Sequence, residues 1–292
     1  MTMEALSLTG PIGTEVRGVD LSAPMTDGDF RRLRALLADR GVLVFRDQRL
    51  ERPQAVSFCE RFGTLQRHVL NQWLADDCPE VMVLSNLATG DPGRASDAER
   101  TARFWHSDLS FMKIPAMATA LYALAVPTQG GDTEFADMCA ALDAMPAALR
   151  DRLTGASAIH DLDHCQQHVH QAPLTDAQRK AAPPVAHPVI RSHPPSGRAA
   201  IYISPLHTSH IVGVPADESR ALMDEVCAFV TQPRFVYVHR WQSGDFVIWD
   251  NRRTLHRGTP YDERERRLLW RLTVDGDAPP MAARSESVHG AA

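Results

Sequence analysis

The sequence lacks a paired-cysteine motif, a long apolar run and an excess of basic residues. Its five cysteines are scattered with no Cys-x-x-Cys pair, a pattern that indicates reduced thiols rather than a disulfide framework or a zinc ribbon. The longest apolar runs, such as residues 116–126, are too short to span a membrane, and no basic segment followed by an apolar one indicates a secretory signal. We therefore expect a cytoplasmic protein without a membrane partner.

Charge and composition further narrow the class of protein to which the chain could belong. The formal net charge of −5 disfavours a nucleic-acid partner, because nucleic-acid-binding proteins usually carry a basic face. A hydrophobic content of 44% and a charged content of 23% are typical of a globular protein. No repeat or long linker divides the chain, so we expect residues 1–292 to form a single domain.

The residue pattern predicts two helices in the first quarter of the chain and mostly short strands after it. Helix-capping residues and terminal glycines predict helices over residues 27–40 and 53–62, and apolar stretches predict strands at 42–45 and 80–85. Further predicted strands cover residues 104–111, 119–126, 132–135, 185–191, 199–203, 235–240, 245–249 and 268–274, and further predicted helices cover 138–153 and 219–231. Many short strands with long connections favour a mainly β fold, a jelly roll with helical additions.

Two connections between these elements are unusually long. Residues 160–184 show no apolar period, and connections of this length in a compact domain are often functional. We interpret residues 160–184 as a candidate lid. Residues 86–103 are polar and charged, which indicates a mobile loop.

A candidate metal site follows this polar segment. His106 and Asp108 lie two residues apart in a predicted strand, so both side chains would point to one face. His256, much later in the chain, supplies a third ligand. Two histidines and one carboxylate on one side of an iron ion leave other positions open for a co-substrate and O₂. With 13 His and 24 Asp in 292 residues, however, about one His-x-Asp triplet is expected by chance, so the triplet alone carries little weight.

Two arginines after His256 give the candidate site a partner for anions. Arg267 and Arg271 lie four residues apart in a strand-like segment, so their side chains share one face. Guanidinium groups bind carboxylates in a two-pronged geometry, which suits a dicarboxylate co-substrate. Thr133, which follows a Gly-Gly turn, offers a hydroxyl group to the same carboxylate. The alternative for the arginines is a solvated edge strand with surface salt bridges.

Five blocks of residues have the order and spacing of one known family. They are His106-x-Asp108, Gly130-Gly131-Asp132-Thr133, Trp249-Asp250-Asn251, His256-Arg257-Gly258 and Arg267. These blocks resemble the taurine and 2,4-dichlorophenoxyacetate dioxygenase family, and the likeness runs from about residue 14 to residue 274. The phenoxyacetate branch is the most similar, because GGDTEFADM, SHIVGVP, TQPRFVYVHRW and GDFVIWDN also resemble it.

The resemblance implies a fold, a metal and a co-substrate. The implied fold is a double-stranded β-helix in which His106, Asp108 and His256 hold Fe(II). The implied co-substrate is 2-oxoglutarate, which chelates the iron through its keto acid while its far carboxylate meets Thr133 and Arg267. With O₂, such an enzyme hydroxylates its substrate and converts 2-oxoglutarate to succinate and CO₂.

The resemblance also implies an anionic substrate. Arg271 would hold the acid group of the substrate, with Arg67 and His68 as further candidates for the same task. The expected substrate is an aryloxyalkanoate similar to 2,4-dichlorophenoxyacetate, whose hydroxylation beside the ether oxygen would release a phenol and an oxo acid. A sulfonate or alkyl-sulfate dioxygenase is an alternative, although Ala102 stands where taurine enzymes carry a polar substrate contact. A zinc hydrolase or a non-catalytic metal-binding jelly roll is more remote, because neither needs an anchor for 2-oxoglutarate.

The remaining histidines allow two interpretations. His160, His164 and His168 are spaced to form a zinc-binding stripe on a helix. The resemblance instead gives His160 a structural or pocket-edge role. His207 and His210 either lie in a hydrogen-bonded loop or approach the mouth of the candidate site.

Three aromatic residues and one amide also lie near the candidate motifs. Trp73, Phe104 and Phe111 are either core residues or walls for an aromatic substrate. Asn251 is expected to brace the turn before His256 through a backbone hydrogen bond. A closed homo-oligomer is the expected assembly.

Overall fold

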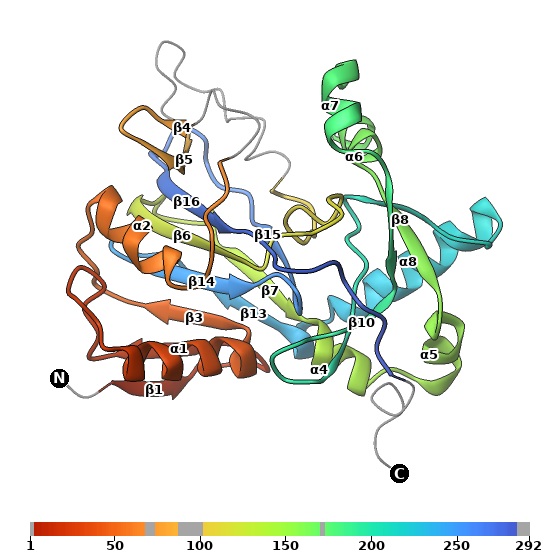
Figure 1. Cartoon of the computed structure of the whole chain (residues 1–292), viewed down its shortest axis with the longest axis horizontal. Coiled ribbons are helices and arrows are strands. Elements are labelled where there is room, and N and C mark those ends of the chain that lie inside the picture. The colour runs from red at the N-terminus through yellow and green to blue at the C-terminus, as the bar shows by residue number, and fades with distance from the viewer. Residues whose placement is uncertain (1–2, 68–73, 87–101, 170–172, 285–292) are drawn as a thin grey trace.

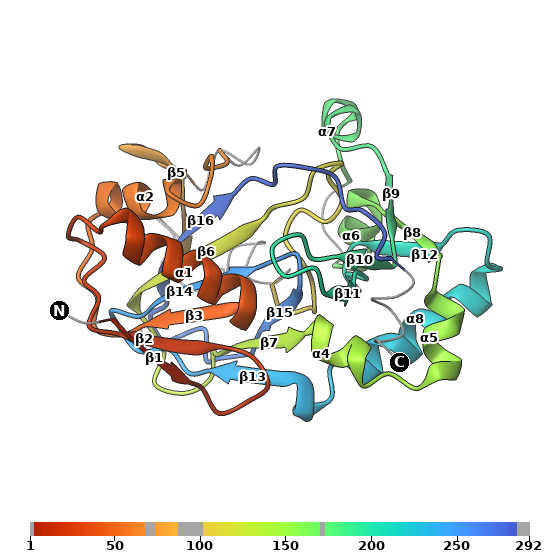
Figure 2. The same cartoon turned by 60° about the horizontal axis from the view of Figure 1, so that its bottom comes forward.

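The central feature of the protein is a pair of facing β-sheets (Figures 1 and 2). The computed structural model describes residues 3–67, 74–86, 102–169 and 173–284. The larger sheet has the strand order β1 (Glu4–Ser7), β2 (Thr14–Arg17), β3 (Val42–Phe45), β14 (Phe246–Asp250), β6 (Ala118–Ala125), β16 (Leu268–Val274), β5 (Cys78–Ser85) and β4 (Leu74–Ala75). The smaller sheet has the order β13 (Val236–His239), β7 (Thr133–Asp137) and β15 (Thr254–Gly258).

Strand β14 shows how the two faces of the larger sheet are used. Successive side chains of a strand point to opposite faces, and all five residues of β14 are buried. Phe246 and Ile248 pack into a core on the outer face, together with residues of α1 (Asp27–Arg40) and α2 (Arg52–Glu60). Val247 and Trp249 instead pack between the sheets, in the core that contains Phe135 of the smaller sheet. The larger sheet is therefore covered on both faces.

Helix α1 has the limits that the sequence predicts. The hydroxyl of Thr26 accepts a hydrogen bond from the backbone N–H of Asp29 and caps the first turn. The helix ends at Gly41, whose φ of +69° is in the left-handed region. A Cβ atom at Gly41 would lie 2.7 Å from a side-chain carbon of Ile12, so both the conformation and the space require glycine here.

A helical lobe is built beside the two sheets. It contains β8 (Ser157–His160), β9 (Val185–Pro188), β10 (Ile190–Ser192), β11 (Ala199–Ile201), β12 (Thr208–Ile211), α4 (Met138–Asp143), α5 (Ala147–Leu153), α8 (Ala216–Val230) and the 3₁₀ helix Pro233–Phe235. Its own apolar core joins α4, α5 and α8 to the strands. The single helix predicted over residues 138–153 is two helices, because Pro146 cannot continue α4 and begins α5 instead.

The structure corrects one other prediction. Residues 104–111 do not form a strand: they form turns, with one bridge that pairs His106 with His256. Leu109, with a φ of +54°, is in the left-handed region and breaks any extended run. The long connection over residues 160–184 is partly helical, with α6 (Leu162–His168) and α7 (Asp176–Ala181) projecting from the lobe (Figure 1). Most of the polar segment 86–103 lies outside the described residues.

A buried ion pair joins the N-terminal helix to the smaller sheet. The guanidinium group of Arg253 donates two hydrogen bonds to the carboxylate of Asp137, at 2.9 and 3.0 Å. It also donates to the backbone oxygens of Ala38 and Asp39 in the last turn of α1. Asp137 in turn caps the first turn of α4. Both side chains are almost inaccessible to solvent, so each charge needs the other as its counter-ion.

The first prediction concerns this ion pair. Replacing Arg253 with methionine should lower the free energy of unfolding by about 3–5 kcal/mol, because Asp137 would remain buried without a counter-ion. Urea unfolding would measure the loss. Arg152 forms an exposed pair with Glu225. Replacing Arg152 with methionine should lower the free energy of unfolding by less than about 1 kcal/mol. An equal loss in the two variants would contradict the structural role given to Arg253.

Candidate metal and co-substrate site

Three side chains from separate parts of the chain meet between the two sheets. Nε2 of His106 lies 3.6 Å from Oδ1 of Asp108, and Nε2 of His256 lies 3.5 Å from Oδ2 of Asp108. Ligand atoms of all three residues lie within 4.8 Å of one another, and all three residues are buried. The backbones of His106 and His256 exchange two hydrogen bonds, of 3.0 and 2.9 Å, which hold the two imidazoles side by side. The predicted triad is therefore assembled, with His256 on strand β15 and with His106 and Asp108 held by a bridge and a turn.

The protonation states of the triad suit a divalent metal. Nδ1 of His106 lies 2.7 Å from the backbone oxygen of Phe104, so Nδ1 carries the proton and Nε2 presents its lone pair. Burial lowers the pKa of His106, and burial also holds the pKa of His256 well below its ordinary value. Burial alone would raise the pKa of Asp108, but the positive charge of the nearby Arg271 and the hydrogen bond from Thr119 lower that pKa. Two neutral imidazoles and one carboxylate are the donor set of non-haem Fe(II) sites.

A chain of buried hydrogen bonds orients the carboxylate of Asp108. The indole N–H of Trp249 can only donate, and it donates to the side-chain oxygen of Asn251 at 3.0 Å. The amide nitrogen of Asn251 then donates to the hydroxyl of Thr119 at 2.9 Å, and that hydroxyl donates to Oδ2 of Asp108 at 2.6 Å. The expectation that Asn251 braces the turn before His256 is corrected: its side-chain hydrogen bonds go to Trp249, Thr119 and the backbone N–H of Asp108, so it supports the carboxylate of the triad.

Arg271 also reaches this carboxylate. Its Nη2 lies 2.7 Å from Oδ1 of Asp108. Its Nε–H is buried and meets no hydrogen-bond partner among the described residues, and the side chain retains 18% exposure. On β16, Leu269 packs between the sheets while Trp270 packs on the outer face, so Arg271 shares the inner face with Leu269. This arrangement leaves a cationic donor beside the triad.

The two residues expected to anchor 2-oxoglutarate lie on opposite sheets. Thr133 is buried at the start of β7, where it pairs with Gly258, two residues beyond His256 on β15. Arg267 is buried immediately before β16, and its guanidinium group lies 5.6 Å from the ring centre of Tyr261. Tyr261 itself pairs with the turn before Thr133, through Gly130. The segment that contains Tyr261 therefore connects the surroundings of the two anchors.

Gly130 is required at this connection. Its φ is +72°, and a Cβ atom there would lie 2.3 Å from the backbone oxygen of Pro260. No side chain can enter such a contact without moving the backbone. The predicted Gly-Gly turn is thus confirmed, and it serves to dock Thr133 against the segment beside Arg267.

Of the other predicted substrate residues, Arg67 does not join this site in the structure. Arg67 lies on the surface with its side chain 68% exposed, and its guanidinium group pairs with Glu80 at 2.7 Å. No contact between Arg67 and the triad is seen among the described residues. His68 and Trp73 lie outside the described residues.

His207 lies in the site, although its sequence context also allowed a hydrogen-bonded loop. Its ring centre lies 6.3 Å from that of His106 and 5.0 Å from that of Phe111. The hydroxyls of Ser110 and Ser204 both lie 3.1 Å from its Nδ1. Burial lowers the pKa of His207 well below its ordinary value, so the ring is neutral. The PLHTSH segment offered no periodic signal that would have separated this inward residue from a loop histidine.

The histidines of the candidate lid do not gather into a metal site. In the described part of the chain, the triad is the one group of three potential metal ligands that lie close together. His160 is buried beside Tyr202, and burial lowers the pKa of His160 to about 3. His168 on α6 contacts the ring of Phe104, with 4.9 Å between ring centres. Phe104 is 39% exposed. The lid thus touches the segment that leads into the triad.

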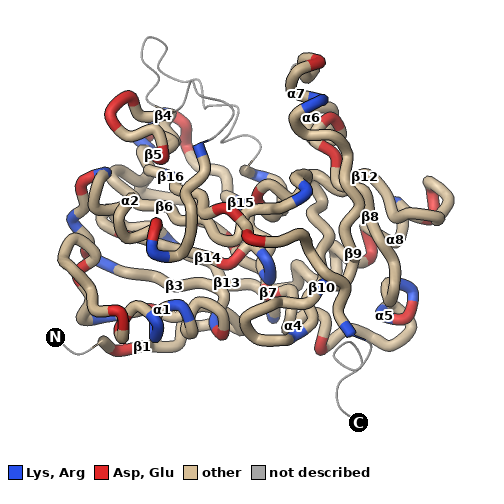
Figure 3. Tube along the Cα trace, in the orientation of Figure 1, with Lys and Arg blue, Asp and Glu red and all other residues tan. Residues whose placement is uncertain are grey.

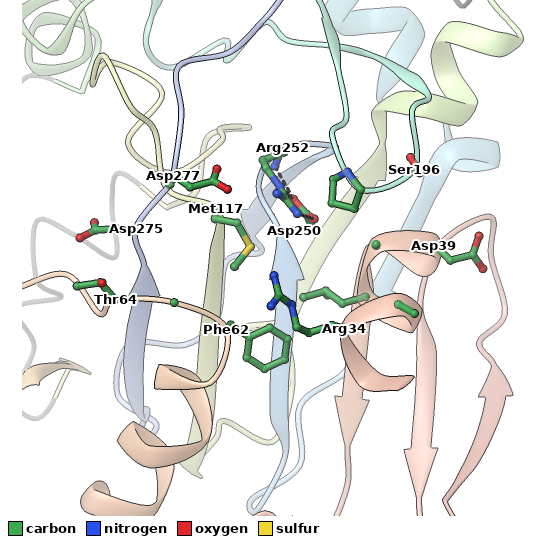
Figure 4. Close-up of a pocket in the computed structure, with 16 residues that line it drawn as sticks. Arg34, Asp39, Phe62, Thr64, Met117, Ser196, Asp250, Arg252, Asp275 and Asp277 are labelled. Atoms are coloured by element: carbon green, nitrogen blue, oxygen red, sulfur yellow. Dashed lines mark hydrogen bonds and ion pairs between the residues drawn. The ribbon is translucent and has the colours of Figure 1, made fainter. Parts of the chain in front are cut away.

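A separate cavity of 580 Å³ opens between α1 and the segment that follows β16 (Figure 4). Arg34 and Arg252 point toward its centre, and none of the triad residues lines it. Asp250 accepts two hydrogen bonds from the guanidinium group of Arg252, at 2.9 and 2.6 Å, and a third contact from His193. These groups satisfy one another, so we assign no ligand to this cavity.

Charges of both signs are interspersed along the described trace (Figure 3). The cationic character of the site therefore comes from Arg267 and Arg271 individually rather than from a broad basic surface. Among the described residues, no helix combines the length and the apolar character that crossing a bilayer requires.

Comparison with known proteins agrees with the geometry. The family described as "Taurine catabolism dioxygenase TauD, TfdA family" matches residues 4–273. The alpha-ketoglutarate-dependent 2,4-dichlorophenoxyacetate dioxygenase of Cupriavidus pinatubonensis is 38% identical over 271 residues, which cover 90% of this chain and 94% of that protein. The (S)-phenoxypropionate/alpha-ketoglutarate-dioxygenase of Sphingobium herbicidovorans is 32% identical over 283 residues, which cover 92% of this chain and 94% of that protein.

A solved structure gives the same result for the fold. The crystal structure of AAD-2 in complex with Mn(II) and N-oxalylglycine superimposes with a TM-score of 0.86 at 33% identity, and the match covers 96% of this chain and 98% of that one. The predictions of a jelly roll and of an enzyme that uses Fe(II), 2-oxoglutarate and O₂ are confirmed. The chain therefore belongs to the TauD/TfdA family of 2-oxoglutarate-dependent dioxygenases.

Proposed function

We propose that His106, Asp108 and His256 are the Fe(II) ligands and that Thr133 and Arg267 bind the far carboxylate of 2-oxoglutarate. The donor set of the triad and its closeness support the first assignment. The second is supported by a buried hydroxyl and a buried guanidinium group joined through the Tyr261 segment. Bound iron, 2-oxoglutarate and O₂ would together oxidise a C–H bond of the substrate, and 2-oxoglutarate would leave as succinate and CO₂.

We further propose that the substrate is a small carboxylate held by Arg271. The observation that carries this proposal is the buried Nε–H of Arg271 beside the triad, for which the described part of the chain offers no acceptor. A substrate carboxylate that accepts this hydrogen bond would satisfy the Nε–H donor of the guanidinium group. It would also place the adjacent substrate carbon near the metal ligands. Arg271 would then hold and orient the substrate rather than take part in proton transfer.

An aryloxyalkanoate fits the groups around Arg271. Phe111 and His207 lie with their ring centres 5.0 Å apart, and both would offer flat surfaces to an aromatic ring. Hydroxylation of the carbon between the ether oxygen and the carboxylate would give a hemiacetal. That hemiacetal would break the bond between the hydroxylated carbon and the ether oxygen. The hydroxyl proton would move to the leaving oxygen, which releases a phenol and an oxo acid.

Substrate class can be tested with purified enzyme by following succinate release. Aryloxyacetates and 2-aryloxypropionates should stimulate release more than alkylsulfonates or alkyl sulfates of similar size. Greater stimulation by the sulfur compounds would show that the alternative predicted from the sequence is correct. The protein should also form a visible charge-transfer band with Fe(II) and 2-oxoglutarate in the absence of oxygen. If no band forms, both the aryloxyalkanoate and the sulfonate or alkyl-sulfate dioxygenase hypotheses are contradicted.

The second prediction concerns Arg271. Replacing it with leucine should raise the KM for an aryloxyacetate by about 10- to 100-fold, because a hydrogen-bonded pair of charges is lost. The affinity for 2-oxoglutarate should change little, since its anchor is formed by other residues. Arg257, which pairs with Glu134 at the rim, provides a matched control in which leucine should leave that KM nearly unchanged. An unchanged KM in the Arg271 variant would remove this residue from the substrate site.

We also propose that α6 and α7 act as a lid over the substrate entrance. The contact between His168 of α6 and the exposed ring of Phe104 supports this role. Asp163 of α6 pairs with Arg179 of α7 at 2.7 Å, which joins the two helices into one unit. The backbone oxygen of Phe104 also fixes the tautomer of His106. Movement of this unit would therefore change the position of His106 in the triad.

A further inference from the structure

The indole of Trp241 lies next to the expected 2-oxoglutarate site. Its Nε1 lies 3.0 Å from the hydroxyl oxygen of Thr133, and both side chains are buried. Trp241 follows the end of β13, the strand whose His239 pairs with Thr133 on β7. The resemblance that identified Thr133 gave no role to Trp241.

The chemistry of the two groups fixes the direction of this hydrogen bond. An indole N–H can donate but cannot accept, so the hydroxyl of Thr133 must be the acceptor. A hydroxyl has one proton and two lone pairs, and the indole occupies one of the lone pairs. Among the described residues the hydroxyl of Thr133 meets no acceptor for its proton. The proton of a buried hydroxyl is therefore available to an acceptor that enters the site.

The position of this proton suits the far end of the co-substrate. Thr133 and Phe135 lie on the same face of β7, since they are two residues apart. Phe135 pairs with His256 and its ring lies against the imidazole, with ring centres 6.2 Å apart. Two residues of a strand span about 6.6 Å. That distance is comparable with the length of a five-carbon dicarboxylate whose other end meets the metal.

Trp241 is held in place by its neighbours. Its ring packs against the edge of His239, with ring centres 4.5 Å apart and an interplanar angle of 84°. His239 is itself fixed by the hydroxyl of Tyr237 at 3.0 Å and by the carboxylate of Asp245 at 3.1 Å. Arg46 pairs with the same carboxylate. The indole is thus supported by a buried network and has little freedom to rotate away from Thr133.

We propose that Trp241 is a positioning residue for 2-oxoglutarate: its N–H fixes the hydroxyl of Thr133 as a hydrogen-bond donor to the far carboxylate. This inference rests on the proposed role of Thr133. Without the indole N–H, the hydroxyl can rotate, and it no longer presents its proton to the carboxylate before binding. Trp241 acts through Thr133 and does not itself touch the co-substrate.

The third prediction tests this role by binding rather than by turnover. Fe(II)-loaded protein is titrated with 2-oxoglutarate without oxygen, and the visible charge-transfer band reports the dissociation constant. Trp241→Phe should raise that constant about tenfold, because the hydrogen bond from the Thr133 hydroxyl to the charged carboxylate is no longer well oriented. Thr133→Val should raise it by at least as much. In the double variant, the effect of Trp241→Phe should disappear, because the hydroxyl that it orients is absent.

Two further variants separate orientation from packing. Incorporation of benzothienylalanine at position 241 removes the N–H while keeping the shape of the indole, and it should reproduce the tenfold effect if Trp241→Phe does not fold. Trp270, which packs on the outer face against Tyr122, is the matched control, and Trp270→Phe should leave the dissociation constant unchanged. The affinity for Fe(II) should be the same in all of these proteins.

Three other outcomes would contradict the role of Trp241, the role of Thr133 or both. If Thr133→Val weakens 2-oxoglutarate binding and neither change at position 241 does, the inference fails and the proposed function stands. If Trp241→Phe has the same effect with and without the Thr133 hydroxyl, the indole acts through packing and the inference fails. If Thr133→Val itself has no effect, the proposed co-substrate site is wrong at Thr133, and the inference fails with it.

Discussion

Replacing Asp108 with alanine is expected to lower both Fe(II) affinity and turnover by more than about 100-fold. Loss of a residue that only supports a metal ligand typically costs 10- to 100-fold, and Asp108 is proposed to be a ligand itself. Its pKa lies below the ordinary value because the charge of Arg271 and the hydrogen bond from Thr119 counteract burial, so it is ionised and ready to bind a cation. Anaerobic titration with Fe(II) would measure the affinity, and succinate release would measure turnover.

Thr119 supplies the matched control for this experiment. Its hydroxyl donates to Oδ2 of Asp108 at 2.6 Å but lies outside the triad. Thr119→Val should therefore lower Fe(II) affinity by about 10- to 100-fold, less than Asp108→Ala does. An Asp108→Ala protein that binds Fe(II) as tightly as the parent would remove Asp108 from the ligand set. Thermal unfolding of both variants would show that the comparison is made on folded protein.

Replacing Arg267 with alanine is expected to raise the dissociation constant of 2-oxoglutarate by about 100-fold. Hydrogen bonds between charged groups contribute about 1.5–3 kcal/mol, and 3 kcal/mol corresponds to a factor of about 150. Arg267 is only 8% exposed, so water screens its interaction with a bound carboxylate weakly. The charge-transfer titration measures this constant directly, and Fe(II) affinity should change less than twofold.

The neighbouring Arg266 makes the test specific to position. Arg266 is exposed, whereas Arg267 is buried, so Arg266→Ala removes the same charge from nearly the same place in the chain. That variant should bind 2-oxoglutarate like the parent. Equal losses of Fe(II) and 2-oxoglutarate affinity in Arg267→Ala would contradict the anchor role, because they would indicate damage to the whole site.

Regular elements of the fold were predictable because their signals are local. The limits of α1 follow from Thr26 and Gly41, which act within one helical turn. Strands β3, β6 and β16 follow from apolar runs that a covered sheet requires. The segment that carries His106 was predicted wrongly as a strand, because its conformation depends on a bridge to a residue 150 positions away.

The residues of the candidate site also fall into those that the sequence predicted and those that it did not. His106, Asp108, His256, Thr133 and Arg267 were named from blocks of sequence in register, which record chemistry that each position must keep. The contribution of His207 and Trp241 was not visible there. His207 acts through contacts with His106, Ser110 and Phe111, and Trp241 acts through its hydrogen bond to Thr133. Contacts between distant residues produce no periodic pattern in the chain.

The sequence by itself determined that the protein carries two imidazoles, one carboxylate and two arginines in an order typical of an iron and 2-oxoglutarate site. Only the tertiary structure decided how these groups are oriented. The hydrogen-bond chain from Trp249 to Asp108, the contact between Arg271 and that carboxylate, and the bond from Trp241 to Thr133 all join distant segments. Orientation depends on distances and angles between side chains, and these exist only after the two sheets have packed face to face.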